Sequence, residues 1–192
     1  AMESLGFYWF SLSQLLEEAG LEVFLVNARH ARNVPGRKTD VSDCQWLQFL
    51  HSVGLLRASF RPSQQICALR AIARHRENLL RQGSRHIQHM QKALDEMNLH
   101  LHHVIDDLTG VTGLAILSAI LEGERDPKVL AQLRDRRIQA GEEVLIQALC
   151  GDYRSEQLFV LRQALRSWQQ VQEQVSECDS ELQKRTAGLE SQ

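Results

Sequence analysis

Three acidic residues, Glu3, Asp40 and Asp43, have types and a spacing that suit catalysis. Asp40 and Asp43 are three residues apart at the expected start of a helix, so both side chains project from its first turn toward one side. Glu3 belongs to the short β-α unit that precedes them. Carboxylates grouped around such a unit can hold a divalent ion for phosphoryl transfer. The sequence therefore contains a candidate site for metal-dependent chemistry.

Helix capping is the competing explanation for the same acids. An aspartate at the N-cap, followed by an acid at the third helical position, satisfies free backbone N–H groups and complements the helix dipole. Glu3 comes just before the helix start expected at residues 6–9 and has a similar explanation. From spacing alone, capping is the stronger interpretation of all three residues.

The elements expected around these acids alternate between strand and helix. Residues 1–4 form a strand-like edge, an amphipathic helix follows until Gly20, and residues 22–26 form an apolar strand. Another helix begins at about Asp40. This βαβα order predicts parallel strands in an α/β sheet. The apolar residues expected to form the helix faces are Leu12, Leu15, Leu16 and Ala19 in the first helix and Trp46, Leu47 and Leu50 in the second.

From Pro62 onward, thirteen positions alternate spacings of three and four, and eleven of them are apolar. This is a coiled-coil seam, and its unbroken run to Leu108 predicts a helix of about 43 residues and about 65 Å. A second seam predicts another long helix near the end of the chain. Because neither stripe is stable in water, we expect the two helices to pack as an antiparallel hairpin. The first seam is Ile66, Leu69, Ala73, Arg76, Leu80, Gly83, Ile87, Met90, Leu94, Met97, Leu101, Val104 and Leu108, and the second is Leu158, Leu161, Leu165, Trp168, Val171, Val175, Cys178, Leu182 and Leu189.

The predicted fold is mainly α, with a partial α/β part that holds two parallel strands, followed by a long antiparallel coiled-coil hairpin with a helical tip. Within the tip, Thr112 is expected to cap a helix, in preference to forming a phosphate-binding loop. We divide the chain into an α/β part at 1–57, the first long helix at 58–108, the tip at 109–153 and the second long helix at 154–192.

Several sequence segments, in matching order and spacing, resemble one known family. They are Met2-Glu3-Ser4 followed by Gly6 and Tyr8-Trp9, then VNARH at 26–30, GRKTDVSDCQWLQ at 36–48 and LLRASFRP at 55–62. The chain resembles the DEDD transposases of bacterial insertion sequences, in particular the one-ten and eleven-eleven group. The resemblance implies a RuvC-like relative of the ribonuclease H fold in the first segment, with four acids, D-E-D-D, at the carboxyl edge of its sheet.

The resemblance reverses the preference for capping. It matches Glu3 to the glutamate of that set, and Asp40 and Asp43 to its last two aspartates. These three are then catalytic residues and ligands of Mg²⁺, which prefers oxygen ligands and bridges phosphate oxygens. The implied parent activity is DNA cleavage and strand exchange in transposition.

The family's first aspartate and its C-terminal serine domain have no counterpart in this sequence. We therefore expect a fragment that lacks both ends, that binds Mg²⁺ weakly if at all and that is inactive alone. The alternative is a catalytically inert coiled-coil module for dimerisation or interaction, in which the acids only cap helices. In either case, we expect a homo-oligomer joined through the coiled coil or the sheet edge.

The net charge of -2 conceals a basic segment. Residues 29–86 hold eleven lysines and arginines against three acids, which suggests a polyanionic partner. A solvated helix face is an equally good explanation from the residues alone. The family resemblance favours nucleic acid, namely DNA and a structured guide RNA. The candidate contacts are Arg29, Arg32, Arg37 and Lys38 beside the acids, and Arg70, Arg74, Arg81 and Arg85 in a stripe on the first long helix.

The sequence argues against two further classes of protein. No apolar run approaches the roughly 18 residues that span a bilayer, and no signal peptide is evident, so we expect a cytoplasmic protein. The cysteines show no metal-binding spacing. The histidines at 86, 89, 100, 102 and 103 therefore favour a polar helix face over a zinc site.

Overall fold

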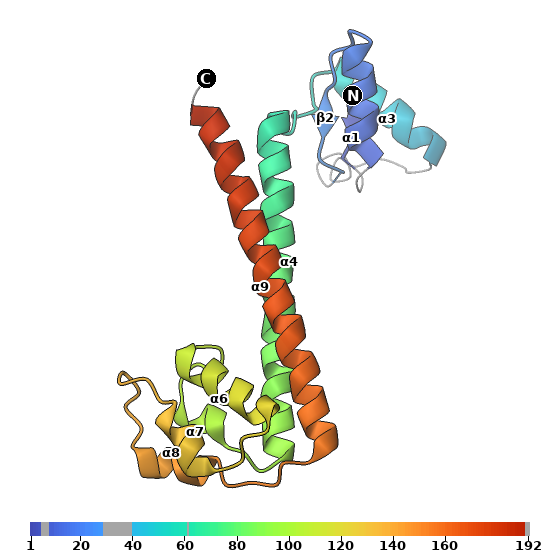
Figure 1. The fold of residues 1–192 in the computed structure, drawn as a ribbon. Coiled ribbons are helices and arrows are strands. Elements are labelled where there is room, and N and C mark those ends of the chain that lie inside the picture. The colour runs from blue at the N-terminus through green and yellow to red at the C-terminus, as the bar shows by residue number, and fades with distance from the viewer. Residues whose placement is uncertain (5–7, 29–39, 61, 191–192) are drawn as a thin grey trace. The chain divides into compact units, whose positions relative to one another are not determined.

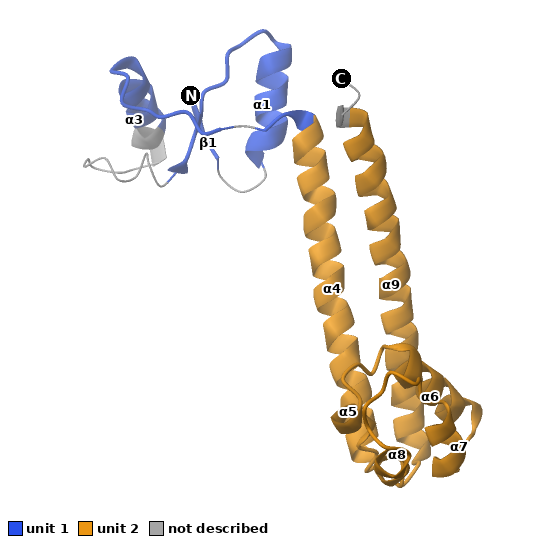
Figure 2. Ribbon diagram, turned by 90° about the vertical axis from the view of Figure 1, so that its left-hand side faces the viewer, with its two compact units in different colours: residues 1–64 blue, residues 65–192 orange. Residues whose placement is uncertain are grey.

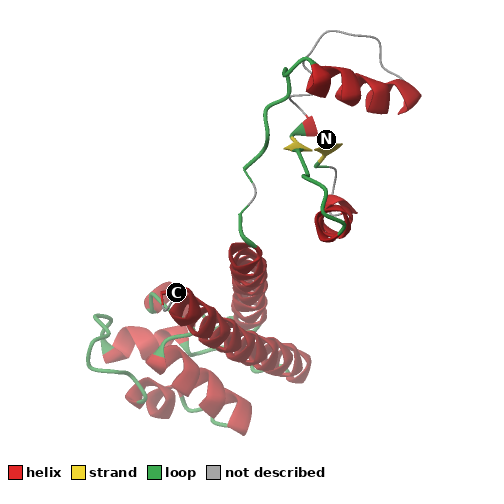
Figure 3. Ribbon diagram, turned by 90° about the horizontal axis from the view of Figure 1, so that it is seen from above, coloured by secondary structure: helices red, strands yellow, loops and turns green. Residues whose placement is uncertain are grey.

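The computed structural model describes residues 1–4, 8–28, 40–60 and 62–190, without the side chains of 40–43 and 189–190. The chain divides into two units, Ala1–Gln64 and Gln65–Gln192 (Figure 2). The described strands lie in the first unit, and helices dominate the rest (Figure 3). A mainly helical fold with two short parallel strands, as predicted, is confirmed.

The first unit is built on a minimal parallel sheet. Strand β1, Met2–Glu3, pairs with β2, Leu25–Val26, and helix α1, Tyr8–Glu18, connects them. The backbone N–H groups of Met2 and Ser4 donate to the carbonyls of Phe24 and Val26 at 2.9 and 3.0 Å. Val26 also forms an antiparallel bridge with Ala58. The predicted β-α-β order is therefore confirmed, although each strand is only two residues long.

The apolar helix faces of the first unit are less buried than the pattern predicts. In helix α3, Asp40–Ser52, Leu50 is fully buried, and Trp46 and Leu47 are half-buried. In α1, however, Leu12 and Leu15 are 50% and 63% exposed. A sheet of two short strands offers too little area to cover the apolar face of α1.

The second unit is a long helical hairpin that carries short helices at one end. Helix α4, Gln64–Glu96, lies beside α9, Ser155–Glu190, and α5 to α8 gather near their junction (Figure 1). In the middle of the hairpin, Leu79 of α4 packs with Val171 and Val175 of α9. The short helices are α5, Leu101–Val104; α6, Val111–Glu122; α7, Pro127–Gln132; and α8, Glu142–Ala148.

The main core lies where the short helices meet the hairpin. All six helices of this unit contribute to it, and its side chains are almost completely withdrawn from water. Burying one such aliphatic side chain stabilises a fold by about 1.5–3 kcal/mol, so this end is the best-anchored part of the hairpin. Its largest fully buried residues are Met90, Leu94, Met97, Leu99, Leu101, Ile116, Leu117, Ile120, Leu130, Leu145 and Leu149.

One polar position of the first seam has a partner on the facing helix. Arg76 donates from Nε to Asp179 at 2.5 Å and from a terminal nitrogen at 3.2 Å. The guanidinium hydrogen bond lowers the pKa of Asp179 below its ordinary value and raises that of Arg76. A bidentate pair of this kind fixes the pairing register of the two helices.

The first long helix is shorter than its seam predicts. It ends at Glu96 and not near Leu108, because Asn98 adopts a left-handed conformation with φ of 56°. Leu99 N–H donates to the Leu94 carbonyl at 2.9 Å, and Asn98 N–H donates to Asp95 at 2.8 Å. These two bonds form a Schellman motif, closed by the burial of Leu94 and Leu99 in one core.

The predicted cap at Thr112 is also wrong. Helix α6 begins at Val111 with Gly110 as its N-cap, so Thr112 lies inside the helix. Its buried hydroxyl accepts a hydrogen bond from the backbone N–H of Asp135 at 2.9 Å. Thr112 therefore ties α6 to the loop after α7.

Among the described helices, none is both long and apolar enough to cross a bilayer.

Candidate metal and nucleic-acid sites

The three predicted acids lie on the elements that the sequence assigned to them. Glu3 is the last residue of β1 and is half-buried. Asp40 is the first residue of α3, and Asp43 follows in the first turn. The side chains of Asp40 and Asp43 lie outside the described residues, so the meeting of the three carboxylates stays a prediction.

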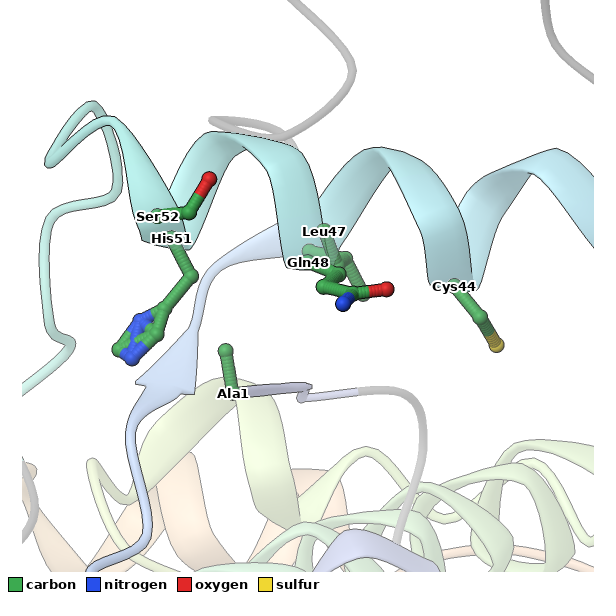
Figure 4. Close-up of a pocket in the computed structure, with 6 residues that line it drawn as sticks. All are labelled: Ala1, Cys44, Leu47, Gln48, His51 and Ser52. Atoms are coloured by element: carbon green, nitrogen blue, oxygen red, sulfur yellow. The ribbon is translucent and has the colours of Figure 1, made fainter.

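A cavity of about 370 Å³ separates the start of β1 from one face of α3. Figure 4 shows Cys44, Gln48 and His51 on the side of α3 that faces Ala1. The spacing of three and four is that of successive helical turns. His51 also packs against Phe24, with 5.1 Å between ring centroids. Residues 44, 47, 48 and 51 therefore form the face of α3 that borders this cavity, while Leu50 is the fully buried residue of the helix.

The basic stripe of α4 is exposed along its whole length. The side chains of this stripe, Arg70, Arg74, Arg81 and Arg85, are exposed. Arg81 forms a surface ion pair with Glu77 one turn away. At 3.6 residues per turn, the four arginines lie within one narrow sector of the helix. The buried residues Leu79, Gly83 and Met90 fall in the opposite sector. The stripe therefore faces away from α9 and is not beside the seam.

The stripe continues to Lys92, which the sequence analysis did not include, while the predicted contacts before α3 cannot be located. Lys92 lies in the same sector as Arg85, is exposed, and pairs weakly with Glu96 at 3.7 Å. Its spacing of seven from Arg85 was the available signal. The predicted contacts Arg29, Arg32, Arg37 and Lys38 fall in 29–39, outside the described residues.

Side chains of types that bind metals also gather at the turn between α4 and α5. One ligand atom each of Asp95, His102 and His103 lies within 4.8 Å of the others. Burial lowers the pKa of His102, and the Asp95 carboxylate opposes this effect. From the sequence we expected a polar helix face here, because no cysteine lies at zinc-ligand spacing to these histidines. The break after Glu96 instead brings Asp95, His102 and His103 together.

Comparison with known families identifies the chain. The family model of the IS110 DEDD transposases, described as Transposase, matches residues 1–99. The chain therefore belongs to this transposase family, which has a role in DNA transposition. No curated protein and no solved structure matches it. The matched stretch contains Glu3, Asp40, Asp43 and every candidate nucleic-acid contact named from the sequence.

Proposed function

We propose that Glu3, Asp40 and Asp43 contribute to a Mg²⁺ centre for DNA cleavage and strand exchange. The observation that carries this proposal is the parallel pairing of β1 with β2, with Glu3 at the carboxyl end of its strand. In open α/β sheets, sites form at the carboxyl ends of parallel strands. The chain that leaves β2 after Val26 departs from the same edge and leads to α3.

The placement of α3 supports the same proposal. Cys44, Leu47 and His51 line the cavity against Ala1, so α3 lies beside the strand that carries Glu3. Asp40 and Asp43 belong to the first turn of this helix.

The chemistry of the donor set fits Mg²⁺. The three residues provide only carboxylate oxygens, which are the ligands that this hard ion prefers. When bound, Mg²⁺ supplies neutralisation of the charge that develops on phosphate oxygens during displacement. The role of the chain is to hold the carboxylates at one edge of the sheet, with basic side chains nearby for the phosphate backbone.

Replacing Asp40 with asparagine is expected to weaken metal binding at least about tenfold without loss of helix. Asparagine caps a helix as well as aspartate does, but it brings no negative charge to the ion. Calorimetric titration of the chain with Mg²⁺ or Mn²⁺, together with circular dichroism, separates the two roles. We expect parent affinity in the millimolar range, on the order of other sites with few carboxylates.

Asp106→Asn is the matched control, because it removes the same charge from an exposed position on the second unit. It should leave metal affinity unchanged. Equal affinity of Asp40→Asn and the parent would leave capping as the only role of Asp40 and would remove the proposed centre.

We also propose that DNA and a structured guide RNA bind the basic segment. Arg70, Arg74 and Arg85 are exposed, and no partner among the described residues neutralises their charge. The family's role in transposition supports the same proposal. We propose Arg29, Arg32, Arg37 and Lys38 as further contacts, because they flank the acids in the sequence.

The second candidate function is a dimerisation module. It is favoured by the exposed apolar residues of the first unit, among them Leu12, Leu15 and Phe60, which is 89% exposed. We expect the chain to form a homo-oligomer at tens of micromolar, through the coiled coil or the exposed face of α1. A monomeric mass in light scattering at that concentration would contradict this expectation.

A further inference from the structure

The turn that ends α4 brings together side chains that a straight helix keeps apart. Nε2 of His102 lies 3.5 Å from a carboxylate oxygen of Asp95, and Nδ1 of His100 lies 3.9 Å from the same oxygen. The rings of His102 and His103 are 4.1 Å apart. Three imidazoles thus surround one carboxylate.

The backbone that carries these side chains is firmly held. The Schellman motif at Asn98 fixes the end of α4, and the His100 N–H donates to the Ala148 carbonyl of α8 at 2.8 Å. Leu101 and Ile105, on either side of His102, are buried in the main core. A site on elements with this support needs little reorganisation to bind a ligand.

His102 is the inner member of the cluster. Its side chain is only 11% exposed, and its buried Nδ1 has no hydrogen-bond partner among the described residues. Nε2 is the ring nitrogen that faces Asp95, so it is the atom available to an ion, whereas the orphaned Nδ1 points away from the cluster. At 3.5 Å, Nε2 and the Asp95 oxygen are farther apart than the atoms of a normal hydrogen bond.

We propose that Asp95, His102 and His103 form a Zn²⁺ site, with His100 or water as a fourth ligand. Imidazole nitrogen and carboxylate oxygen are both zinc ligands, whereas Mg²⁺ prefers oxygen alone. Ligand atoms of a tetrahedral zinc site are about 3.3 Å apart. The present separations of up to 4.8 Å close through rotation of Asp95 and His103, both of which are exposed.

The bound ion would join the last turn of α4 to α5 and lock the turn at Asn98. This site shares no residue with the proposed Mg²⁺ centre, since Asp95 belongs to the second unit and Glu3 to the first. The two proposals therefore stand or fall independently.

Zinc titration of the whole chain tests the site. Cys44, Cys67, Cys150 and Cys178 form no disulfide, and their thiols can bind zinc themselves. The titration therefore uses a background with all four changed to serine. We expect one zinc ion per chain and a rise in the unfolding temperature with zinc. The double variant His102→Ala and His103→Ala should lower the affinity at least about a hundredfold.

Two further variants keep the result interpretable. Asp95→Asn alters an exposed ligand and should lose affinity even if the His102 variant folds poorly. The control, His86→Ala with His89→Ala, removes two neighbouring histidines of α4 whose rings are 6.1 Å apart, and should bind zinc like the background. Absence of zinc binding in the background, or equal loss in the control, would overturn the proposal.

Discussion

Replacing Gly113 with alanine is expected to destabilise the second unit by about 3 kcal/mol or more. Gly113 lies in the first turn of α6 and is buried. A Cβ atom there would meet the Leu108 carbonyl oxygen at 2.1 Å and its carbon at 2.6 Å. These are backbone atoms beside a packed core, so no side-chain rotation relieves the overlap. The helix propensity gained from alanine, about 1 kcal/mol, cannot offset it.

Gly83→Ala is the matched control within α4. A Cβ atom there would lie 3.5 Å from Cγ1 of Val171, which is ordinary van der Waals contact. The expected result is stabilisation by about 0.5–1 kcal/mol, because alanine restricts the unfolded chain and favours the helix. Urea unfolding followed by circular dichroism measures both variants. Equal stability of the two would show that α6 does not approach Leu108 closely.

Much of the fold follows from patterns that depend on nearby residues. The spacing of apolar residues predicted the two facing helices, and Leu161, Leu165, Val171 and Val175 of the second seam are buried as expected. The first seam is only partly correct, because Ile66 and Leu80 are exposed and Leu79 is buried in place of Leu80. The same holds for the order of β1, α1 and β2. These predictions succeed because a helix or strand with one apolar face has few ways to bury it.

The failed predictions depend on turns and on distant partners. The seam continues past Glu96 in sequence, but Asn98 tolerates the left-handed conformation that closes a Schellman motif. Asn98 followed by the apolar Leu99 was the available sign of a helix end. The apolar spacing, which continues beyond this point, favoured an unbroken helix instead. Thr112 serves a loop more than twenty residues away, which no local pattern encodes.

The candidate sites show the same division. Spacing alone favoured capping for Asp40 and Asp43, and only the family resemblance indicated metal chemistry. The cluster at Asp95 was missed because His102 is seven residues further along, about 10 Å on a continuous helix. The helix break turns that separation into a contact of 3.5 Å. Recognising the site thus required the turn to be recognised first.

Removing three arginines from the α4 stripe is expected to reduce the salt dependence of nucleic-acid binding. Contacts from four to six basic residues, drawn from Arg37, Lys38, Arg70, Arg74, Arg81 and Arg85, give a log-log slope of roughly -3 to -5, because each neutralised phosphate releases counterions. Changing Arg74, Arg81 and Arg85 to alanine should flatten the slope by about two to three. Helix content should not fall, since alanine is a strong helix former and these positions are exposed.

A control with the same charge change distinguishes a binding surface from general electrostatics. Arg166, Lys184 and Arg185 are exposed on α9, and Arg185 pairs with Glu181 as Arg81 pairs with Glu77. Exposed pairs of this kind contribute little, so neither triple variant should lose much stability. Fluorescence anisotropy with duplex DNA and structured RNA, over a series of salt concentrations, gives both slopes. A localised contact reduces counterion release only when the arginines of the α4 stripe are removed. If the α4 variant keeps the parent's slope, or if both variants flatten the slope equally, the stripe is therefore a solvated face.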